Sequence, residues 1–109
     1  MQYINKIEIQ GIVGSIRSNT LYNDTVYSMS VETTTMYRSK ENQQPIAEIM
    51  WHIVVVWAST TSTDLSKVEK GTPVRVVGRL RTTKYTDPNG IERIYNEVIA
   101  GEFEIIAND

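Results

Sequence analysis

Apolar and polar residues alternate along several stretches of the chain, and this period of two predicts β-strands. The predicted strands cover residues 4–17, 25–37, 46–58, 74–86 and 91–106, all rich in Val, Ile, Thr and Tyr. Turn-forming clusters separate them at 18–24, 38–45 and 87–90. Inside the first strand, Gly11 and Gly14 mark the expected bend or bulge points. The pattern therefore predicts an all-β protein.

The segment between the third and fourth strands differs in character. Thr63 or Asp64 can cap a short helix over 64–70, and Gly71 is placed to end it. Leu65 and Val68 stand three residues apart and give that helix one apolar face. Five strands with one short helix between strands 3 and 4 is the element order of an OB-fold, a five-stranded Greek-key barrel. Other small β-barrels share much of this order, so the order alone leaves them open.

The third strand hardly alternates, because its core sequence reads AEIMWHIVVVW. Trp51, Ile53 and Trp57 share one face of this strand, while Met50, Val54 and Val56 share the other and can supply the core. The tryptophan face is either a stacking surface or a filler of the core or of a subunit interface. The pattern fits both interpretations equally.

The fourth strand separates apolar from charged residues. One face holds Val74, Val76, Gly78 and Leu80, and the other holds Arg75, Arg79, Arg81 and Tyr85. A solvated face would more often mix Lys with Glu. Arginines beside an aromatic ring are the parts of a groove for single-stranded nucleic acid. This strand favours the groove over a merely solvated face.

Length and composition narrow the class of protein. The 109 residues fit one domain over 1–109, and the net charge of −2 argues against a globally basic nucleic-acid binder. The absence of cysteine excludes disulfides and thiolate sites and suits a reducing cytoplasm. We expect neither a signal peptide nor a membrane span, since no apolar run is long enough.

The sequence contains no motif that indicates a catalytic or metal-binding site. His52 is the single histidine and is expected to be structural, because no other ligand is spaced for a triad or a metal. The acidic residues Glu92, Glu97, Glu102 and Glu104 are expected to be solvated. The sequence therefore predicts no catalytic residue, no metal site and no cofactor.

Three segments carry a family resemblance: NKIEIQGIVGSIR, MWHIVVVW and KGTPVRVVGRLRTTKYTDPNGIER. Over nearly its whole length the chain resembles the bacterial single-stranded DNA-binding protein (SSB) family. The resemblance implies a non-enzymatic OB-fold that binds and protects single-stranded DNA in replication, recombination and repair. The aromatic residues implied to stack on bases are Tyr37, Trp51, Trp57 and Tyr85. The residues implied to contact phosphates are Lys6, Arg38, Lys40, Arg79, Arg81 and Lys84.

The resemblance also implies a homotetramer, with a dimer possible, in the cytoplasm at the bacterial nucleoid. Typical members continue past the barrel with a flexible linker and an acidic tip, whereas this sequence stops at EFEIIAND. The sequence is either the core of a longer protein or a tailless relative, and protein partners recruited through such a tail are not expected. An alternative is a tailless primosome-type adapter, an OB-fold dimer that acts mainly through protein partners. A carbohydrate-binding or hydrolytic barrel is a further alternative, although catalytic groups for hydrolysis are missing.

Overall fold

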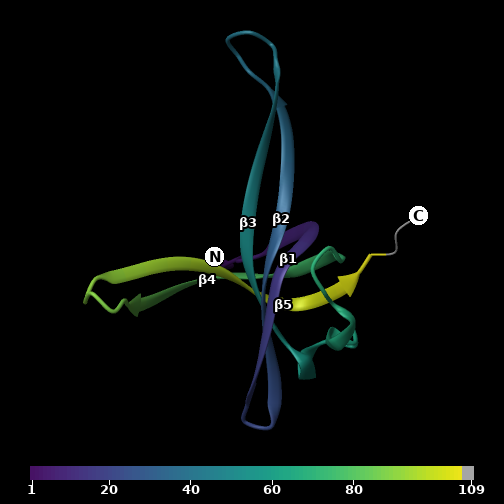
Figure 1. Cartoon of the computed structure of the whole chain (residues 1–109), viewed down its shortest axis with the longest axis vertical. Coiled ribbons are helices and arrows are strands. Elements are labelled where there is room, and N and C mark those ends of the chain that lie inside the picture. The colour runs from purple at the N-terminus through teal and green to yellow at the C-terminus, as the bar shows by residue number, and fades with distance from the viewer. Residues whose placement is uncertain (107–109) are drawn as a thin grey trace.

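Five long strands close into a single barrel in the computed structural model, which describes residues 1–106 (Figure 1). The strands are β1 (Ile7–Leu21), β2 (Asp24–Arg38), β3 (Pro45–Trp57), β4 (Pro73–Thr86) and β5 (Glu92–Ile105). Their order around the barrel is β1-β2-β3-β5-β4, and all neighbours are antiparallel except β3 and β5. The predicted OB-fold is confirmed. The predicted single domain over 1–109 includes residues 107–109, which lie outside the described residues.

The barrel closes because β1 bends and pairs with two different strands. Its first half pairs with β4 and its second half with β2. At Gly11 the strands come so close that a Cβ would overlap the carbonyl oxygen of Glu32. At Gly14 the register shifts, since Val13 pairs with Val31 and Ser15 with Ser30. The expected bend and bulge in the first strand are thus confirmed.

Valine side chains fill the barrel. The most completely buried ones are Val13, Val31, Val54, Val56, Val74 and Val76. Leu65 and Val68 join this cluster from the connection between β3 and β4. Burying a side chain of this size contributes about 1.5–3 kcal/mol, so this cluster is the main source of stability. The predicted inward face of the third strand is confirmed for Val54 and Val56 but wrong for Met50, which is 51% exposed where β3 continues into the projecting β2–β3 hairpin.

The predicted helix over 64–70 is wrong in kind. The connection holds two short 3-10 turns, η1 (Ala58–Thr60) and η2 (Leu65–Lys67). Asp64 caps η2 as expected, by accepting hydrogen bonds from the backbone and the side chain of Ser66. Such local bonds compete with a regular helix. One turn already buries Leu65, and Gly71 then reverses the chain with φ of 95°.

The predicted turn over 18–24 is too long. β1 continues to Leu21 in register with β2, so that the turn itself is only Tyr22 and Asn23. Both have positive φ, 53° and 62°, as a tight two-residue hairpin requires. Pairing with a neighbouring strand satisfies the backbone groups of residues 18–21, and this outweighs their turn-forming composition.

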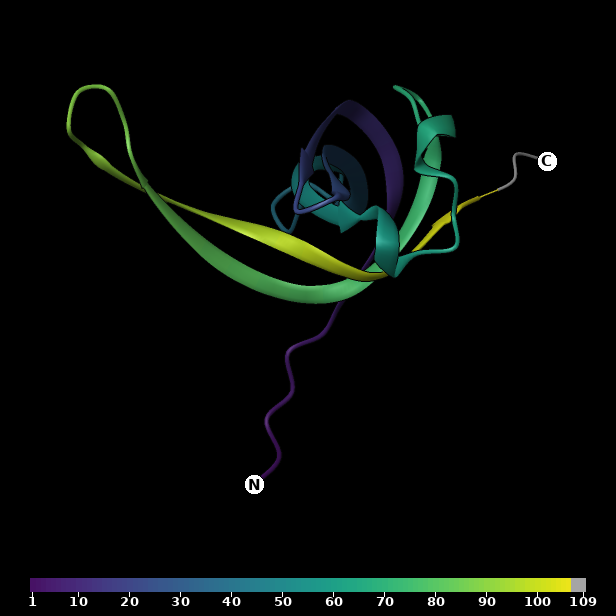
Figure 2. The same cartoon turned by 90° about the horizontal axis from the view of Figure 1, so that it is seen from below.

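Besides the β1–β2 hairpin at the bottom of Figure 1, two further hairpins extend well beyond the barrel (Figures 1 and 2). We call them the β2–β3 arm and the β4–β5 arm. In Figure 2 the β4–β5 arm curls, with its concave side toward β1 and β2. The side chain of Asn5 ties the N-terminal segment to the base of this arm through two hydrogen bonds with the backbone of Leu80. Among residues 1–106, no helix has the length and apolarity needed to span a membrane.

Candidate nucleic-acid interface

One outward face of the barrel crosses all five strands. In the parallel pair, Ile53 of β3 lies beside Glu97 of β5, and Glu97 lies opposite Arg81 of β4. Toward the other edge, Ile53 lies opposite Ser30 of β2, which lies opposite Ser15 of β1. Residues that face each other across strands point to the same side of a sheet. The tryptophan face of β3 and the arginine face of β4, 30 residues apart in the chain, are therefore joined through β5.

Trp51 lies on this outward face with 56% of its surface exposed. Its ring crosses over β1 at Gly14, where a Cβ would overlap the ring atoms. Gly14 thus leaves the space in which the indole lies. Trp57, at the barrel end of the same face, is half-buried and outside the core cluster. The interpretation of these tryptophans as core residues is wrong.

Tyr85 lies on the concave side of the β4–β5 arm and is 50% exposed. Its ring packs edge-on against Tyr95, with 5.6 Å between the centroids and 64° between the planes. Tyr95 was missed by sequence reasoning. The register of the hairpin with the DPNG turn could have found it, because Tyr95 lies opposite Thr83 and therefore diagonal to Tyr85.

Tyr37 stands apart from the other three predicted stacking residues. It is 48% exposed near the tip of the β2–β3 arm, opposite Ile46. Trp51 lies opposite Glu32, an odd number of residues from Tyr37 along β2. The two aromatic side chains therefore point to opposite sides of the hairpin. The structure brings Trp51, Trp57 and Tyr85 to one face but does not bring Tyr37 to it.

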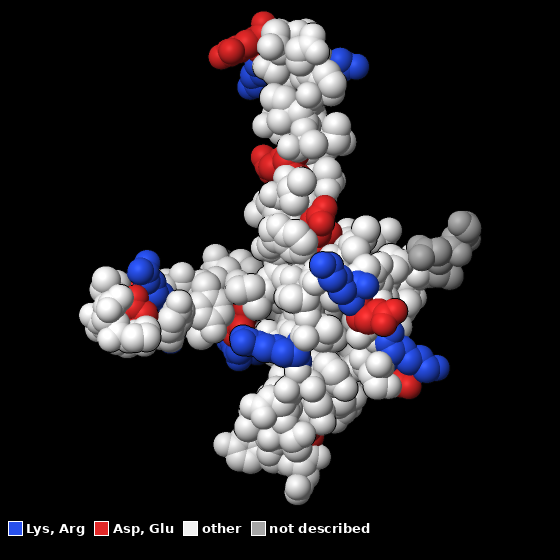
Figure 3. Space-filling model, viewed as in Figure 1, with Lys and Arg blue, Asp and Glu red and all other residues white. Residues whose placement is uncertain are grey.

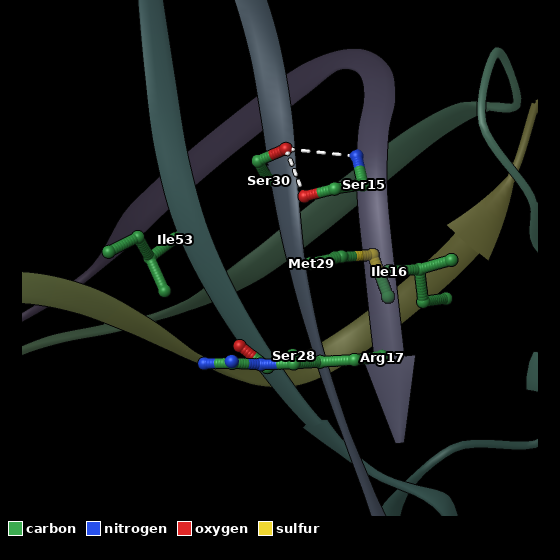
Figure 4. A pocket seen from close by; sticks show the side chains of 7 residues that line it. All are labelled: Ser15, Ile16, Arg17, Ser28, Met29, Ser30 and Ile53. Carbon is green, nitrogen blue, oxygen red and sulfur yellow. Dashed lines mark hydrogen bonds between the residues drawn. The ribbon is translucent and has the colours of Figure 1, made fainter.

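Two adjoining hollows lie on the outward face. The first has a volume of about 370 Å³ and lies over β1, β2 and β3 (Figure 4). The second, of about 300 Å³, lies between the barrel and the β4–β5 arm and is lined by Tyr85, Tyr95 and Glu97 among others. Arg17, Ser28 and Ile53 line both. We call the combined hollow the groove. It is open, contains serine hydroxyls, and ends at the exposed ring of Tyr85 and the half-buried ring of Tyr95.

The six predicted phosphate contacts divide into two classes. Within residues 1–106, four of them form no ion pair: Lys6, Arg38, Lys40 and Arg79. Arg81 pairs with Glu97, and Lys84 lies 3.8 Å from Glu92. On the side shown in Figure 3, basic side chains form separate groups on the arms and the barrel rather than one continuous patch. Positive charge is therefore confined to separate places on this side of the molecule, in keeping with the net charge of −2.

Glu97 is buried, with 6% exposure, so the prediction that it is solvated is wrong. One of its oxygens, Oε1, accepts hydrogen bonds from Arg81 Nε at 2.9 Å and from Thr83 Oγ1 at 2.8 Å. Arg81 Nη2 also donates to this oxygen. The contact between β3 and β5 covers Glu97, and a buried carboxylate requires such donors. The Arg81–Glu97 pair lies on the outward face, and Glu97 lines the second hollow.

Asp87 organises the tip of the β4–β5 arm. Its carboxylate accepts hydrogen bonds from the backbone N–H groups of Ile91 (2.9 Å) and Asn89 (3.0 Å) and from Arg93 Nε (3.0 Å). The backbone bond from Ile91, followed by the Arg93 side chain, lowers the pKa of Asp87. The predicted DPNG turn is present, since the N–H of Gly90 donates to the carbonyl of Asp87.

The remaining charged residues named in the sequence analysis lie away from the groove. Arg75 forms ion pairs with Glu8, Glu102 and Glu104, and the hydrogen bond with Glu8 is the main cause of its raised pKa. Its guanidinium therefore has carboxylate partners already. Nε2 of His52 lies 2.8 Å from the hydroxyl of Thr33, in agreement with a structural role. In the described part of the chain, no three potential ligands gather to hold a metal.

Comparison with known proteins identifies the family. The model of the single-strand binding protein family matches residues 4–106. A single-stranded DNA-binding protein of Xanthomonas campestris is 31% identical over 94% of this chain and 60% of its own length. Single-stranded DNA-binding protein 1 of Xylella fastidiosa is 26% identical over 97% of this chain and 79% of its own length.

Solved structures agree with this comparison. The Plasmodium falciparum SSB in complex with ssDNA superposes with a TM-score of 0.85 and 27% identity, covering 100% of this chain and 98% of that one. A deletion variant of the Thermus aquaticus single-stranded DNA-binding protein has a TM-score of 0.76 at 16% identity, covering 95% of this chain and 51% of that one, and supports the fold alone. The chain spans about 60% of the Xanthomonas relative. Because the family model matches nearly its whole length, the chain belongs to the single-strand binding protein family.

Proposed function

We propose that this chain binds single-stranded DNA without sequence specificity and without catalysis, and so protects it during replication, recombination and repair. The observation that carries the proposal is the outward face on which exposed Trp51 lies over Gly14, next to the groove residue Ser30, while exposed Tyr85 lines the far end of the groove. Membership in the family and likeness to a structure solved with ssDNA support it.

Stacking would supply most of the binding free energy. Each base that stacks on Trp51, Trp57 or Tyr85 contributes about 1–3 kcal/mol, and every base offers a suitable π-face. Tyr37 would add a contact with DNA that continues along the β2–β3 arm. The unpaired cations Lys6, Arg38, Lys40 and Arg79 would neutralise phosphates directly. Arg81 and Lys84 would contribute less, because each already has a carboxylate neighbour.

A tryptophan-fluorescence titration tests the proposal. Oligo-dT and an oligonucleotide of mixed sequence are added at several salt concentrations. We expect quenching with similar affinity for both, and an affinity that falls as salt rises because counterions are released. Unchanged fluorescence at low salt would remove the support for Trp51 and Trp57 as stacking residues.

Trp51 allows a sharper test with matched variants. Trp51→Ala should weaken oligo-dT binding by about 1–3 kcal/mol, whereas Trp51→Phe keeps a ring and should lose less. Tyr3→Ala is the control, because Tyr3 is an exposed aromatic residue in the N-terminal segment, outside the outward face. Equal losses for Trp51→Ala and Tyr3→Ala would count against a specific stacking position.

Self-association into a homotetramer, location at the cytoplasmic nucleoid, and the absence of tail-recruited partners stay predictions from the resemblance. Light scattering with the full chain separates the main alternatives. A tetramer that binds oligo-dT tightly agrees with the proposal. A dimer that binds it only weakly would favour the primosome-type adapter.

A further inference from the structure

Arg17 is a basic residue of the groove that the sequence analysis did not single out. It lies on β1 opposite Ser28 of β2. In Figure 4 its side chain extends from β1 across Ser28, and its guanidinium ends beyond β2. It lines both hollows of the groove, together with Ser28 and Ile53. Arg17 therefore lies where the two hollows meet.

The other charged groups around the groove are already paired. Arg93 lines the second hollow, but its Nε donates to Asp87 at 3.0 Å. The buried carboxylate of Glu97 is matched by Arg81. Within residues 1–106, no carboxylate lies within ion-pair distance of Arg17. Arg17 thus supplies the one groove-lining positive charge in this range that has no carboxylate partner.

The surroundings of Arg17 suit a nucleotide rather than an acidic side chain. Ile53 and the Tyr85–Tyr95 ring pair supply apolar and aromatic surface for a base or sugar. Serine hydroxyls and an arginine are common phosphate donors in complexes with nucleic acids. Each hollow, at about 370 and 300 Å³, falls at the lower end of the sizes that hold small ligands.

We propose that the groove is a nucleotide subsite on the path of single-stranded DNA between Trp51 and Tyr85, and that Arg17 contacts the phosphate of the nucleotide held there. The inference rests on the proposed function and adds a residue and a route to it. Arg81, by contrast, contributes less because it is already paired with Glu97.

A charge-matched set of variants tests the role of Arg17. Arg17→Gln and Arg75→Gln each remove one positive charge, but Arg75 lies among three glutamates away from the groove. Oligo-dT affinity is measured for the full chain over a series of salt concentrations, with circular dichroism to check folding. The third variant of the set, Arg17→Lys, keeps the positive charge.

For Arg17→Gln we expect about a threefold or larger loss of affinity at low salt and a salt slope reduced by about 0.7, the value for one phosphate of a single strand. Arg75→Gln should keep the wild-type slope, and Arg17→Lys should restore it. Each of three results would overturn the subsite. The first is a wild-type salt slope for Arg17→Gln, and the second is an equal loss of oligo-dT affinity for Arg17→Gln and Arg75→Gln. The third is a failure of Arg17→Lys to restore the salt slope. If the wild-type chain does not bind oligo-dT, the proposed function itself fails, which is a distinct result.

Discussion

The two arms that leave the barrel hold their aromatic residues in different ways. On the β4–β5 arm, cross-strand contacts follow one another from base to tip, through Arg81–Glu97, Thr82–Asn96 and Tyr85–Tyr95 to the Asp87 turn. On the β2–β3 arm, within the described residues, no ion pair joins the two strands. Its cross-strand polar contacts are fewer: Thr33 bonds to His52 nearer the barrel, and at the tip Arg38 donates to the carbonyl of Gln43.

This difference bears on the cost of binding. A ring that is already fixed, such as Tyr85 against Tyr95, loses little freedom when a base stacks on it. A ring on a less constrained arm, such as Tyr37, must be ordered at the moment of binding, at about 0.5–1.5 kcal/mol per side chain. We therefore expect the β4–β5 arm to act as the preformed half of the interface and the β2–β3 arm as the adaptable half.

The largest effect is expected from Glu97→Gln, which disrupts the base of the β4–β5 arm. Loss of the charged acceptor for Arg81 should lower the free energy of unfolding by about 1–3 kcal/mol, measured by urea denaturation. The same change frees Arg81 and should steepen the salt dependence of oligo-dT binding.

Glu92→Gln is the matched control on the same arm. Its partner Lys84 is exposed and 3.8 Å away, so the loss of stability should stay below about 1 kcal/mol. If the two variants lost equal stability, the buried pair would have no special part in holding the arm.

The second prediction compares the two arms through their tyrosines. Tyr85→Ala should reduce oligo-dT affinity by about 1–3 kcal/mol, and Tyr37→Ala should cost less by about 1 kcal/mol because part of its stacking energy is offset by ordering. Fluorescence titrations of both variants check this. A larger loss for Tyr37→Ala would reverse the assignment of preformed and adaptable halves.

Tyr95 provides a control within the second prediction. Because it touches the ring of Tyr85 and not the rings of Tyr37 or Trp51, Tyr95→Ala should couple with Tyr85→Ala in a double-mutant cycle. Strict additivity of these two substitutions would argue that Tyr95 does not orient Tyr85.

The smallest effect concerns the tip of the β4–β5 arm and depends on pH. The folded-state pKa of Asp87 is lowered below its unfolded value of about 3.9, mainly by the backbone bond from Ile91. Its contribution to stability is therefore complete above that value and is lost as the pH falls through the lowered pKa. Urea denaturation of the wild type and Asp87→Asn between neutral pH and pH of about 3 should give a stability difference that shrinks with acid. If the stability difference did not change with pH, the negative charge of Asp87 would not be the cause of that difference.

Local pattern was enough to predict the strands and the inward position of Val54 and Val56, and the family resemblance then distinguished the OB-fold from other small barrels. Strand periodicity, the DPNG turn and the apolar residues Val54 and Val56 are all short-range signals. The positions missed depend on contacts between distant segments. The burial of Glu97 depends on the contact between β3 and β5, and the place of Arg17 in the groove depends on Ile53 and the β4–β5 arm, which are distant from it in the sequence.

The same limit applies to the short elements. Composition favoured a turn over residues 18–24, but pairing with β2 extended β1 to Leu21. A helix was expected after Asp64, but one 3-10 turn already buries Leu65. In both places the tertiary surroundings outweighed the local preference.

The parallel contact between β3 and β5 has a consequence for the order of folding. It consists of three register pairs, Ile53–Glu97, Val54–Val98 and Val55–Ile99, whereas the hairpins pair strands that are adjacent in sequence. Closing a long loop costs entropy before its contacts form, so we expect the hairpins to form early and this seam to close late. Pulse-labelling hydrogen exchange during refolding should protect seam amides after hairpin amides, and simultaneous protection would contradict this order. A chain caught before closure would carry the tryptophan and arginine halves of the interface at opposite ends of one open sheet, connected only through β1.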